Sequence, residues 1–409
     1  MNRNVDTKVP LQGIRVIDFT HWQAGPTCSL ILAELGAEVI KVEPLEGEQG
    51  RWAGLITELG ESLAFQARNR GKLSVTVNIK TELGKELVRD LVKTSDIFVE
   101  NYRVGVLERL GFGYESLKAL QPKIIMTSIT GYGQYGPYAN KPAHDPLMYP
   151  VSGIMSLTGS PDGPPMRVGV PIADRVAGIN GALATLVALY RRAITGEGEH
   201  IDVALLDGMV FALDFFATEY CYNRKLPLRT GNRLQGTGPN GYFKCKDGAV
   251  FILASSDRRF RRLCEMMGKP ELLEDPRFAR NTDRYKHEDE LHRVIGAWTG
   301  ERTVEEVLQS CDQYDVEAAP VLSLPEVMEN PQVKARKYFE ELEHPLLGKT
   351  TYPGPLLKGY PTPTHMIHPA PLLGEHNGYV CRELLGYSEE KIRMLQDTGA
   401  ICPKEGEDR

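Results

Sequence analysis

The chain has 409 residues, a length that corresponds to two or three domains of ordinary size. Its 48 Lys and Arg residues against 54 Asp and Glu residues give a net charge of −6, whereas nucleic-acid-binding domains carry a basic excess. No stretch reaches the ~18 consecutive apolar residues of a membrane span, and the first residues lack the apolar core of a signal peptide. These features predict a cytoplasmic globular protein that binds neither nucleic acid nor a membrane.

The first half of the chain alternates between strand-like and helix-like segments. Residues 13–19 have the β-branched content of a buried strand, Ala24-Gly25-Pro26 forms a turn, and apolar residues within 27–35 recur at helical spacing. A strand at 38–43 completes a βαβ unit, which predicts a parallel sheet and an α/β fold. Further strands are predicted at 74–79, 96–99, 123–128 and 199–204, and helices at 82–94, 104–110, 179–192 and 205–222.

The second half is predicted to form a smaller α+β unit and a C-terminal part. Residues 224–241 lack periodicity and are typical of a linker or an active-site loop. Seven prolines within 345–371 predict an extended crossing segment rather than a packed element. A strand is predicted at 249–254, and helices at 258–268, 285–298, 303–313, 375–385 and 388–397. The predicted domains are a large one in 1–223, a small one in 224–330 and a C-terminal part in 331–409.

The sequence excludes several common classes of site. The seven cysteines are scattered without a C-x-x-C pair, so we expect neither a disulfide framework nor a metal site. The first βα turn, His21-Trp22-Gln23-Ala24-Gly25-Pro26, lacks the three glycines of a dinucleotide fingerprint. This absence disfavours a nicotinamide-dependent redox enzyme.

A few residues are candidates for chemistry, each with a structural alternative. Gln23 either stabilises its turn or reaches into a cleft at the carboxyl ends of the strands. Asp174 precedes a long small-residue helix, so it is either a plain N-cap or a reactive carboxylate. His144 lies in a proline-containing loop. It is either a structural residue whose ring nitrogens are hydrogen-bonded within the protein or a catalytic residue. Lys41, Lys80 and Arg109 are either phosphate contacts or ordinary surface charges.

Short motifs are spread along nearly the whole chain. They are Gly13-Ile14-x-Val16-x-Asp18, Leu35-Gly36-Ala37-Glu38-Val39, Asn69-x-x-Lys72-x-Ser74, Val99-Glu100-Asn101-Tyr102, Ala319-Pro320-Val321 and Leu373-Gly374-Glu375-His376. In this order the motifs resemble those of the family III CoA-transferases. This family contains formyl-CoA, carnitine and succinyl-CoA-dependent transferases as well as α-methylacyl-CoA racemases. The resemblance implies a Rossmann-like large domain, a small domain inserted in sequence, and two interlocked chains. The partner chain is either an identical copy or a related member of the family.

The resemblance also implies site residues and a reaction. Asp174, in D-x-x-x-G with Gly178, falls on the catalytic aspartate, and Gln23 falls on the active-site glutamine. The residues that fall on CoA contacts are Trp22, Lys80, Asn101, Tyr102 and Arg109. The implied reaction moves CoA from a donor thioester, with succinyl-CoA as the expected donor, to a free carboxylic acid through aspartyl anhydride and aspartyl-CoA thioester intermediates. The CoA thioester is then a substrate, and no cofactor is bound permanently.

The acceptor and the role of His144 are less constrained. Aromatic residues and few basic residues near the catalytic segment favour a substituted succinate or an aryl acid as acceptor. We expect the helix N-terminus to hold the pKa of Asp174 low. Racemases of the family carry a histidine thirty residues before their aspartate, as His144 lies before Asp174. A racemase with these two residues as paired bases is therefore the alternative, although His21 and Gln23 resemble formyl-CoA transferase and favour the transferase.

Overall fold

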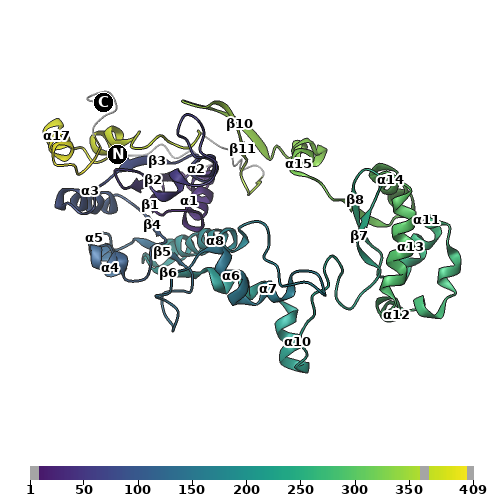
Figure 1. The fold of residues 1–409 in the computed structure, drawn as a ribbon. Helices are drawn as coiled ribbons and strands as arrows, with labels where there is room; N and C mark the ends of the chain where they lie inside the picture. The colour runs from purple at the N-terminus through teal and green to yellow at the C-terminus, as the bar shows by residue number, and fades with distance from the viewer. Residues whose placement is uncertain (1–8, 360–367, 403–409) are drawn as a thin grey trace. The chain divides into compact units, whose positions relative to one another are not determined.

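The computed structural model describes residues 9–359 and 368–402, which divide into two compact units. One unit comprises the described residues within Met1–Ile154, Val168–Asp214 and Gln332–Arg409, and the other comprises Met155–Arg167 and Phe215–Pro331. The chain therefore leaves the first unit and returns to it, and the yellow C-terminal helix α17 (Glu389–Asp397) belongs to the same unit as the purple N-terminal strands (Figure 1).

The first unit is built on a six-stranded sheet in which every neighbouring pair is parallel. Its strands are β1 (Arg15–Phe19), β2 (Glu38–Glu43), β3 (Leu73–Thr76), β4 (Ile97–Glu100), β5 (Ile125–Thr130) and β6 (His200–Ala204). Their order is β3-β2-β1-β4-β5-β6, which is the Rossmann order, so the predicted α/β class and Rossmann-like sheet are confirmed. The order in which strands are added to the sheet reverses between β1 and β4, and such sheets bind their ligands at this switch point.

Helices cover both faces of this sheet (Figure 1). Helices α1 (Ala24–Glu34) and α8 (Ile172–Thr195) pack against each other on one face. The other face carries α3 (Glu82–Lys93), α4 (Val106–Leu110) and α5 (Tyr114–Leu120), whose buried Leu and Val residues share a core with Ile17, Phe19 and Phe98 of the strands. Because strand side chains alternate, the neighbours of Ile17 on β1 point toward α1 instead.

A buried polar network lies on the α1 face of the sheet. The side chain of Asp18 is fully buried, and its Oδ2 accepts hydrogen bonds from Lys72 Nζ at 2.8 Å and Ser29 Oγ at 2.7 Å. Lys72 Nζ also donates to Asn69 Oδ1 at 2.8 Å, and Lys41 Nζ lies 3.8 Å from Asp18 Oδ1. These contacts join β1, β2, α1 and the segment before β3, and they explain the N-x-x-K spacing.

The C-terminal part of the chain binds the edge strand β3. The backbone oxygen of Ser74 accepts a hydrogen bond from His376 N at 3.0 Å, and its Oγ accepts one from Gly374 N at 3.0 Å. The amide of Asn377 bonds to Thr76 through both its Oδ1 and its Nδ2. Two sequence motifs that lie 300 residues apart thus form one structural contact.

Two predictions from the sequence are wrong in detail. The proline-rich segment is not entirely an unpaired crossing, because β10 (Phe339–His344) and β11 (Gly348–Pro353) form an antiparallel hairpin. Residues 360–367 of that segment lie outside the described part of the chain. The helix predicted at 205–222 is divided into α9 (Leu205–Phe211) and α10 (Phe215–Asn223), because Asp214 between them adopts a left-handed conformation with φ of 46°.

The second unit is a small α+β assembly. An antiparallel sheet of β7 (Asn240–Lys244), β8 (Ala249–Leu253) and β9 (Glu317–Pro320) packs with α11 (Asp257–Met267), α13 (Glu288–Gly300) and α14 (Val304–Tyr314). Only β8 was predicted among these strands, since β7 and β9 contain no β-branched residues.

The remaining α-helices are α2 (Leu63–Asn69), α6 (Asp145–Ser152), α7 (Ile154–Leu157), α12 (Asn281–Lys286), α15 (Leu324–Glu329) and α16 (Pro331–Ala335). Short 3-10 helices occur at Gln49–Trp52, Pro270–Leu273 and Pro276–Phe278, and a π-helical turn occurs at Tyr379–Leu384.

Helix α8 is the one helix in the described ranges that is long and apolar enough to span a membrane by length and composition. This is weak evidence, because the core helix of a globular domain passes the same test. The small residues of α8 pack on α1 and on the sheet, among them Ala177, Gly181 and Thr185, and the helix belongs to the core of the first unit.

The buried network generates a prediction for stability. Replacing Lys72 by Met removes the cation that bonds Asp18 and leaves that carboxylate buried without the nearer of its two cationic partners. Breaking one side of a buried ion pair costs about 3–5 kcal/mol. The free energy of unfolding of Lys72→Met, measured by urea titration and circular dichroism, should be lower than that of the parent protein by that amount.

Lys85→Met is the control, because it breaks only the helix-surface pair with Glu82. It should change the free energy of unfolding by less than about 0.5 kcal/mol. Equal effects of the two substitutions would contradict this account.

Candidate active site

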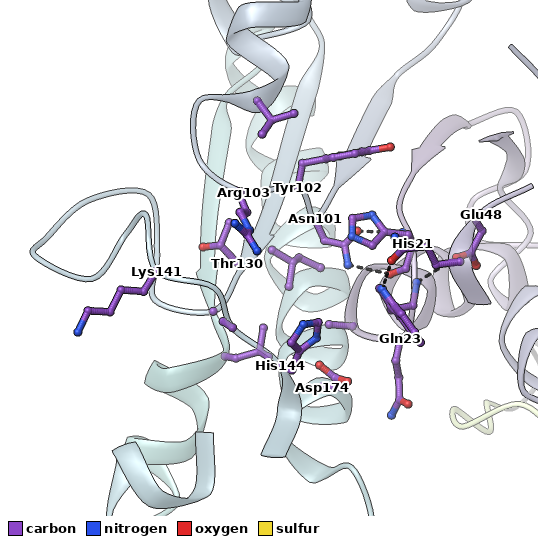
Figure 2. Close-up of a pocket in the computed structure, with 18 of the residues that line it drawn as sticks. His21, Gln23, Glu48, Asn101, Tyr102, Arg103, Thr130, Lys141, His144 and Asp174 are labelled. Atoms are coloured by element: carbon purple, nitrogen blue, oxygen red, sulfur yellow. Dashed lines mark hydrogen bonds between the residues drawn. The ribbon is translucent and has the colours of Figure 1, made fainter. Parts of the chain in front are cut away.

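A cavity of about 790 Å³ opens at the carboxyl ends of β1, β4 and β5. The loop after β1 contributes His21, Trp22 and Gln23 to its lining, and the loop after β4 contributes Asn101, Tyr102 and Arg103. Thr130, Lys141, His144 and Asp174 add further polar groups, as do the side chains of Glu46, Glu48 and Gln49. Figure 2 shows the labelled side chains around this cavity, with the amine of Lys141 pointing away from Asp174. The cavity therefore lies at the reversal of strand order, the position that the fold predicts for a ligand.

The loop after β1 is held by side chains from two other segments. Asn101 Oδ1 accepts a hydrogen bond from His21 N, and its Nδ2 donates to His21 O, both at 2.9 Å. Trp22 has a φ of 65°, a conformation that costs free energy in residues other than glycine, and its N–H donates to Glu48 Oε2 at 3.2 Å. Asn101, predicted as a CoA contact, thus has its amide engaged in positioning this loop.

Gln23 follows this turn and begins α1 as its N-cap residue. The residue is only 6% exposed, and its Nε2 has no hydrogen-bond partner among the described residues. Buried N–H groups are nearly always bonded, so an unfilled donor in a cavity wall is suited to a ligand oxygen. The structural alternative, in which the Gln23 amide stabilises its own turn, has no hydrogen bond to support it.

Asp174 lies in the first turn of α8, where it is held by residues of α6. Its backbone N–H donates to Asp145 Oδ2 at 3.2 Å. The Tyr149 hydroxyl donates to Val170 O at 2.6 Å and accepts from Ile172 N at 2.9 Å, which fixes the segment before α8.

Glycine at position 178 brings the start of α8 close to α1. A Cβ atom there would lie 2.6 Å from Thr27 Cβ and 2.8 Å from Ala24 O, so any larger residue would push the two helices apart. This close approach accounts for the glycine of the D-x-x-x-G motif. It sets Asp174, one helical turn earlier, beside the segment that carries Gln23.

The electrostatic setting of Asp174 differs from the expectation. Burial, followed by the charge of Asp145, raises its pKa to about 6, while Arg68 and Arg175 oppose the increase. The expected low pKa is therefore wrong, because desolvation and a like charge outweigh the helix N-terminus. With a pKa about one unit below neutral pH, roughly nine-tenths of the Asp174 carboxyl groups are ionised at pH 7.

The other candidate residues occupy different positions relative to the cavity. His144 is the exposed N-cap residue of α6, with its ring 6.4 Å from that of Trp22. Lys80 and Arg109 are exposed and do not line this cavity. Lys41 is fully buried, with Nζ bonded to Thr20 O at 2.8 Å, so a role as a phosphate contact is wrong.

Sequence reasoning missed two cations of the cavity, Arg103 and Lys141. Arg103 was identifiable, because it follows the Asn101-Tyr102 motif directly after a predicted strand. Lys141 had no local signal, since its loop reaches the site only through the fold. No cluster of three or more His, Cys, Asp or Glu residues able to hold a metal ion occurs in the described ranges.

Comparison with known proteins identifies the family. The sequence profile of CoA-transferase family III matches residues 11–377. The chain belongs to CoA-transferase family III. It is 39% identical to the succinate–glutarate CoA-transferase of Agrobacterium fabrum over 387 residues, covering 92% of this chain and 96% of the relative. It is 36% identical to the succinyl-CoA–D-citramalate CoA-transferase of Chloroflexus aurantiacus, covering 95% and 97%.

Solved structures agree with this assignment. A crystal structure of a CAIB/BAIF family protein from Brucella suis superposes with a TM-score of 0.84 and 35% sequence identity, covering 92% of this chain and 99% of that one. The resemblance inferred from the motifs is confirmed over nearly the whole chain, and the protein is a CoA-transferase. CoA thioesters are accordingly its substrates.

The raised pKa of Asp174 generates a prediction for the pH dependence of this CoA-transferase. A nucleophilic carboxylate must be ionised, so kcat/KM should fall below a pH of about 6. Asp145→Asn removes the neighbouring negative charge while its amide oxygen still accepts the Asp174 N–H, so this limb should move to lower pH. Initial rates measured between about pH 4.5 and 8 test both statements. Asp397→Asn, an exposed change in α17, is the control and should leave the profile in place.

Stability provides an independent check of the same pKa. A carboxyl group whose folded pKa is raised stabilises the fold below its unfolded pKa and loses that contribution as pH rises through about 6. At pH 8 the free energy of unfolding of Asp174→Asn, measured by urea titration, should therefore exceed that of the parent protein by about 2–3 kcal/mol. At pH 4 the two proteins should differ little in this free energy. If Asp145→Asn leaves the pH profile of kcat/KM unchanged and Asp174→Asn leaves the free energy of unfolding unchanged at pH 8, Asp174 does not have a raised pKa.

Proposed function

We propose that this cavity transfers CoA from succinyl-CoA to a free carboxylic acid, with Asp174 as the nucleophile. The observation that carries the proposal is an ionised, largely buried carboxylate that shares a cavity with the unfilled N–H donor of Gln23. Burial raises the free energy of the charged carboxylate, which increases its reactivity toward a thioester carbonyl.

The proposed reaction consists of four displacements at carbonyl carbons. An oxygen of Asp174 attacks the donor thioester, the C–S bond breaks, and a mixed anhydride forms with release of CoA thiolate. The thiolate then attacks the Asp174 carbonyl carbon and expels the donor acid as a carboxylate, leaving an enzyme thioester. The acceptor carboxylate displaces the thiolate to form a second anhydride, and the thiolate attacks the acceptor carbonyl, which regenerates the Asp174 carboxylate. No net proton, electron or water enters.

Gln23 and the shape of the cavity support these steps. Each displacement places negative charge on a carbonyl oxygen, and the free N–H of Gln23 is a suitable donor for it. His144 lines the same cavity as a second polar group. Water must be excluded, because both the anhydrides and the thioester hydrolyse.

The CoA moiety is proposed to run from Asp174 across the cavity toward its cationic lining. Trp22 and Tyr102 offer aromatic surfaces, and Arg103 and Lys141 offer positive charge for its phosphates. Lys80 and Arg109, at exposed positions, remain proposed contacts for the nucleotide end. Loss of one charge-assisted contact costs about 1.5–3 kcal/mol, so Arg103→Ala and Arg109→Ala should each raise the KM for succinyl-CoA tenfold or more with little change in kcat. An unchanged KM would remove that residue from the CoA site.

The covalent intermediate is the direct test of the transferase mechanism. After incubation with succinyl-CoA and quenching with hydroxylamine, mass spectrometry should find a hydroxamate on the peptide that contains Asp174. Asp174→Ala should lose on the order of 10³-fold or more in CoA exchange, because the substitution removes the carboxylate that forms both covalent intermediates. Asp397→Asn serves again as the matched carboxylate control. Substantial exchange by Asp174→Ala would refute the assignment.

The position of His144 in the same cavity as Asp174 keeps the racemase as the second candidate function. Two bases on one substrate exchange the α-proton of an acyl-CoA, and no acceptor acid is then required. In heavy water without acceptor, the transferase should leave the α-position of a 2-methylacyl-CoA unlabelled. His144→Ala should lower CoA transfer by about 10²-fold at most, as for loss of an oxyanion donor. Rapid deuterium uptake that His144→Ala abolishes would favour the racemase.

We propose that the active form is an interlocked dimer, a homodimer or a pair with a related chain. An apolar stripe on the first unit supports this proposal: residues at spacings of three and four along α8 are 40–72% exposed, namely Ile179, Leu183, Val187, Tyr190 and Ile194. Contiguous apolar surface of this kind marks an interaction site. Light scattering should report twice the mass of the chain for the pure protein, and Leu183→Arg should shift it toward the monomer. If the pure protein is monomeric, the homodimer is excluded and the proposed partner is a related chain.

A further inference from the structure

A buried carboxyl group at the end of β4 plays no part in the proposed reaction. Glu100 is the last residue of that strand and is only 4% exposed, and its Oε2 accepts a hydrogen bond from Tyr102 N at 2.7 Å. This bond fixes the backbone between the Asn101 amide, which holds the loop after β1, and Arg103, which lines the cavity (Figure 2). Glu100 thus supports the loop after β4 without lining the cavity itself.

A second glutamate of the same sheet shows what distinguishes Glu100. Glu43 is the last residue of β2 and is also buried, but both of its carboxylate oxygens bind Arg51, at 2.7 and 2.8 Å. Burial raises the pKa of Glu43, and the charges and hydrogen bonds of its partners, Arg51 foremost, bring it below the ordinary value. Glu100 forms no ion pair with an arginine or lysine of the described chain. Burial, opposed by the hydrogen bonds of Ser128 and Tyr102, therefore raises the pKa of Glu100 to about 7.

A line of hydrogen bonds connects this carboxyl group with the surface. Ser128 lies beside Glu100 in the register of β4 and β5, and its hydroxyl group bonds to the carboxylate. Its Oγ also lies 2.8 Å from Nε2 of His200, an exposed residue of β6 whose ring stacks on Tyr114 of α5. Burial, opposed by nearby carboxylates, keeps the pKa of His200 below its ordinary value, so the ring is neutral at neutral pH. Two uncharged side chains thus link the buried carboxyl group to water.

Negative charges act on Glu100 from two neighbouring elements. Glu108 on α4 and Asp202 on β6 both raise its pKa. On β1, the residue beside Glu100 in register is Phe19, which carries no charge. The phenol of Tyr102 is also uncharged, because burial and then the charge of Glu100 raise its pKa to about 12. These surroundings favour the protonated form of Glu100, whereas the N–H and O–H groups that bond to it favour the carboxylate.

We propose that Glu100 is a positioning residue, which holds the loop after β4 in place for CoA while its carboxyl group is ionised and loosens it on protonation. The inference rests on the proposed CoA site in the cavity. A hydrogen bond to a charged carboxylate is roughly twice as strong as one to a neutral group. Proton uptake by Glu100 therefore weakens its bond to Tyr102 N and loosens the surfaces that Tyr102 and Arg103 offer to CoA.

The proton reaches Glu100 through Ser128 and His200. His200 takes a proton from solvent at Nδ1 and gives up the one at Nε2 to Ser128 Oγ, while Ser128 passes its own hydroxyl proton to Glu100. The imidazole and the hydroxyl group are neutral before and after, and one proton has moved from solvent to the carboxylate. Deprotonation follows the reverse path.

Binding of CoA itself tests this proposal, because free CoA carries no acyl group that reacts at Asp174. Isothermal titration calorimetry measures the Kd of CoA for the full-length parent enzyme and for Glu100→Gln between about pH 6 and about pH 8.5. Glu100→Gln keeps an oxygen that accepts Tyr102 N but cannot ionise. The phosphate monoester of CoA titrates at about pH 6 as well, so the quantity to compare at each pH is the ratio of the two Kd values.

The Kd of Glu100→Gln should match that of the parent at about pH 6 and exceed it about three- to tenfold at about pH 8.5, with a midpoint at about pH 7. Ser128→Ala removes a hydrogen bond to the ionised carboxylate, so in that variant the midpoint should move to higher pH. At about pH 8.5, Glu100→Gln should raise the KM for succinyl-CoA by a similar factor with little change in kcat. Glu390→Gln, an exposed change in α17, should bind CoA like the parent at every pH.

A Kd ratio that stays constant over this pH range would overturn the role of Glu100. If Glu100→Gln does not fold, Ser128→Ala decides, and an unmoved midpoint overturns the proposal. Tyr102→Ala and Arg103→Ala identify a different failure: if both leave the Kd of CoA unchanged, the proposed CoA site fails together with this inference. If both weaken binding while the ratio stays constant, the site stands and only the role of Glu100 is lost.

Discussion

The site depends on the ion pair that Lys72 and Lys41 form with Asp18 inside the first unit. All three side chains are fully buried, so the charges stabilise the fold only while they stay together. Lys41 extends the network to Glu48 at 3.8 Å, and Glu48 in turn accepts the N–H of Trp22. A chain of buried charges therefore runs from the centre of the sheet to the left-handed residue that begins the active-site loop. The loop after β1, which lines the cavity, is positioned by contacts with the core rather than by its own short sequence.

The pKa of Asp174 results from opposing effects, among which burial is the largest. The helix N-terminus, Arg68 and Arg175 favour the ionised form, whereas burial and Asp145 disfavour it, and the outcome is a pKa of about 6. A carboxylate with this pKa is ionised at neutral pH and is still a better nucleophile than an exposed aspartate, because it is less well solvated. Asp145 has two effects, since it also accepts the backbone N–H of Asp174 and so fixes the proposed nucleophile in place.

The cationic side chains of the first unit have different roles, which depend on where each side chain lies. Lys41 and Lys72 are buried and structural, Arg103 and Lys141 line the cavity, and the charges of Arg68 and Arg175 act on Asp174. The two cations of the cavity lining suit the phosphates of CoA in the proposed function. Net charge gives no hint of it, because the chain as a whole is acidic.

The sequence alone determined the α/β class, the parallel sheet, most strand positions and, through its motifs, the family. These features follow from local patterns: β-branched runs form strands, helical periodicity forms the helices, and a motif is a contiguous string. It also identified Gln23, His144 and Asp174, which the structure brings into one cavity. Tertiary structure alone decided which charges meet. The pKa of Asp174 depends on burial, on Asp145 at 29 residues before it and on Arg68 at about a hundred residues before it. Burial, which sets the strength of each interaction, exists only in the folded chain.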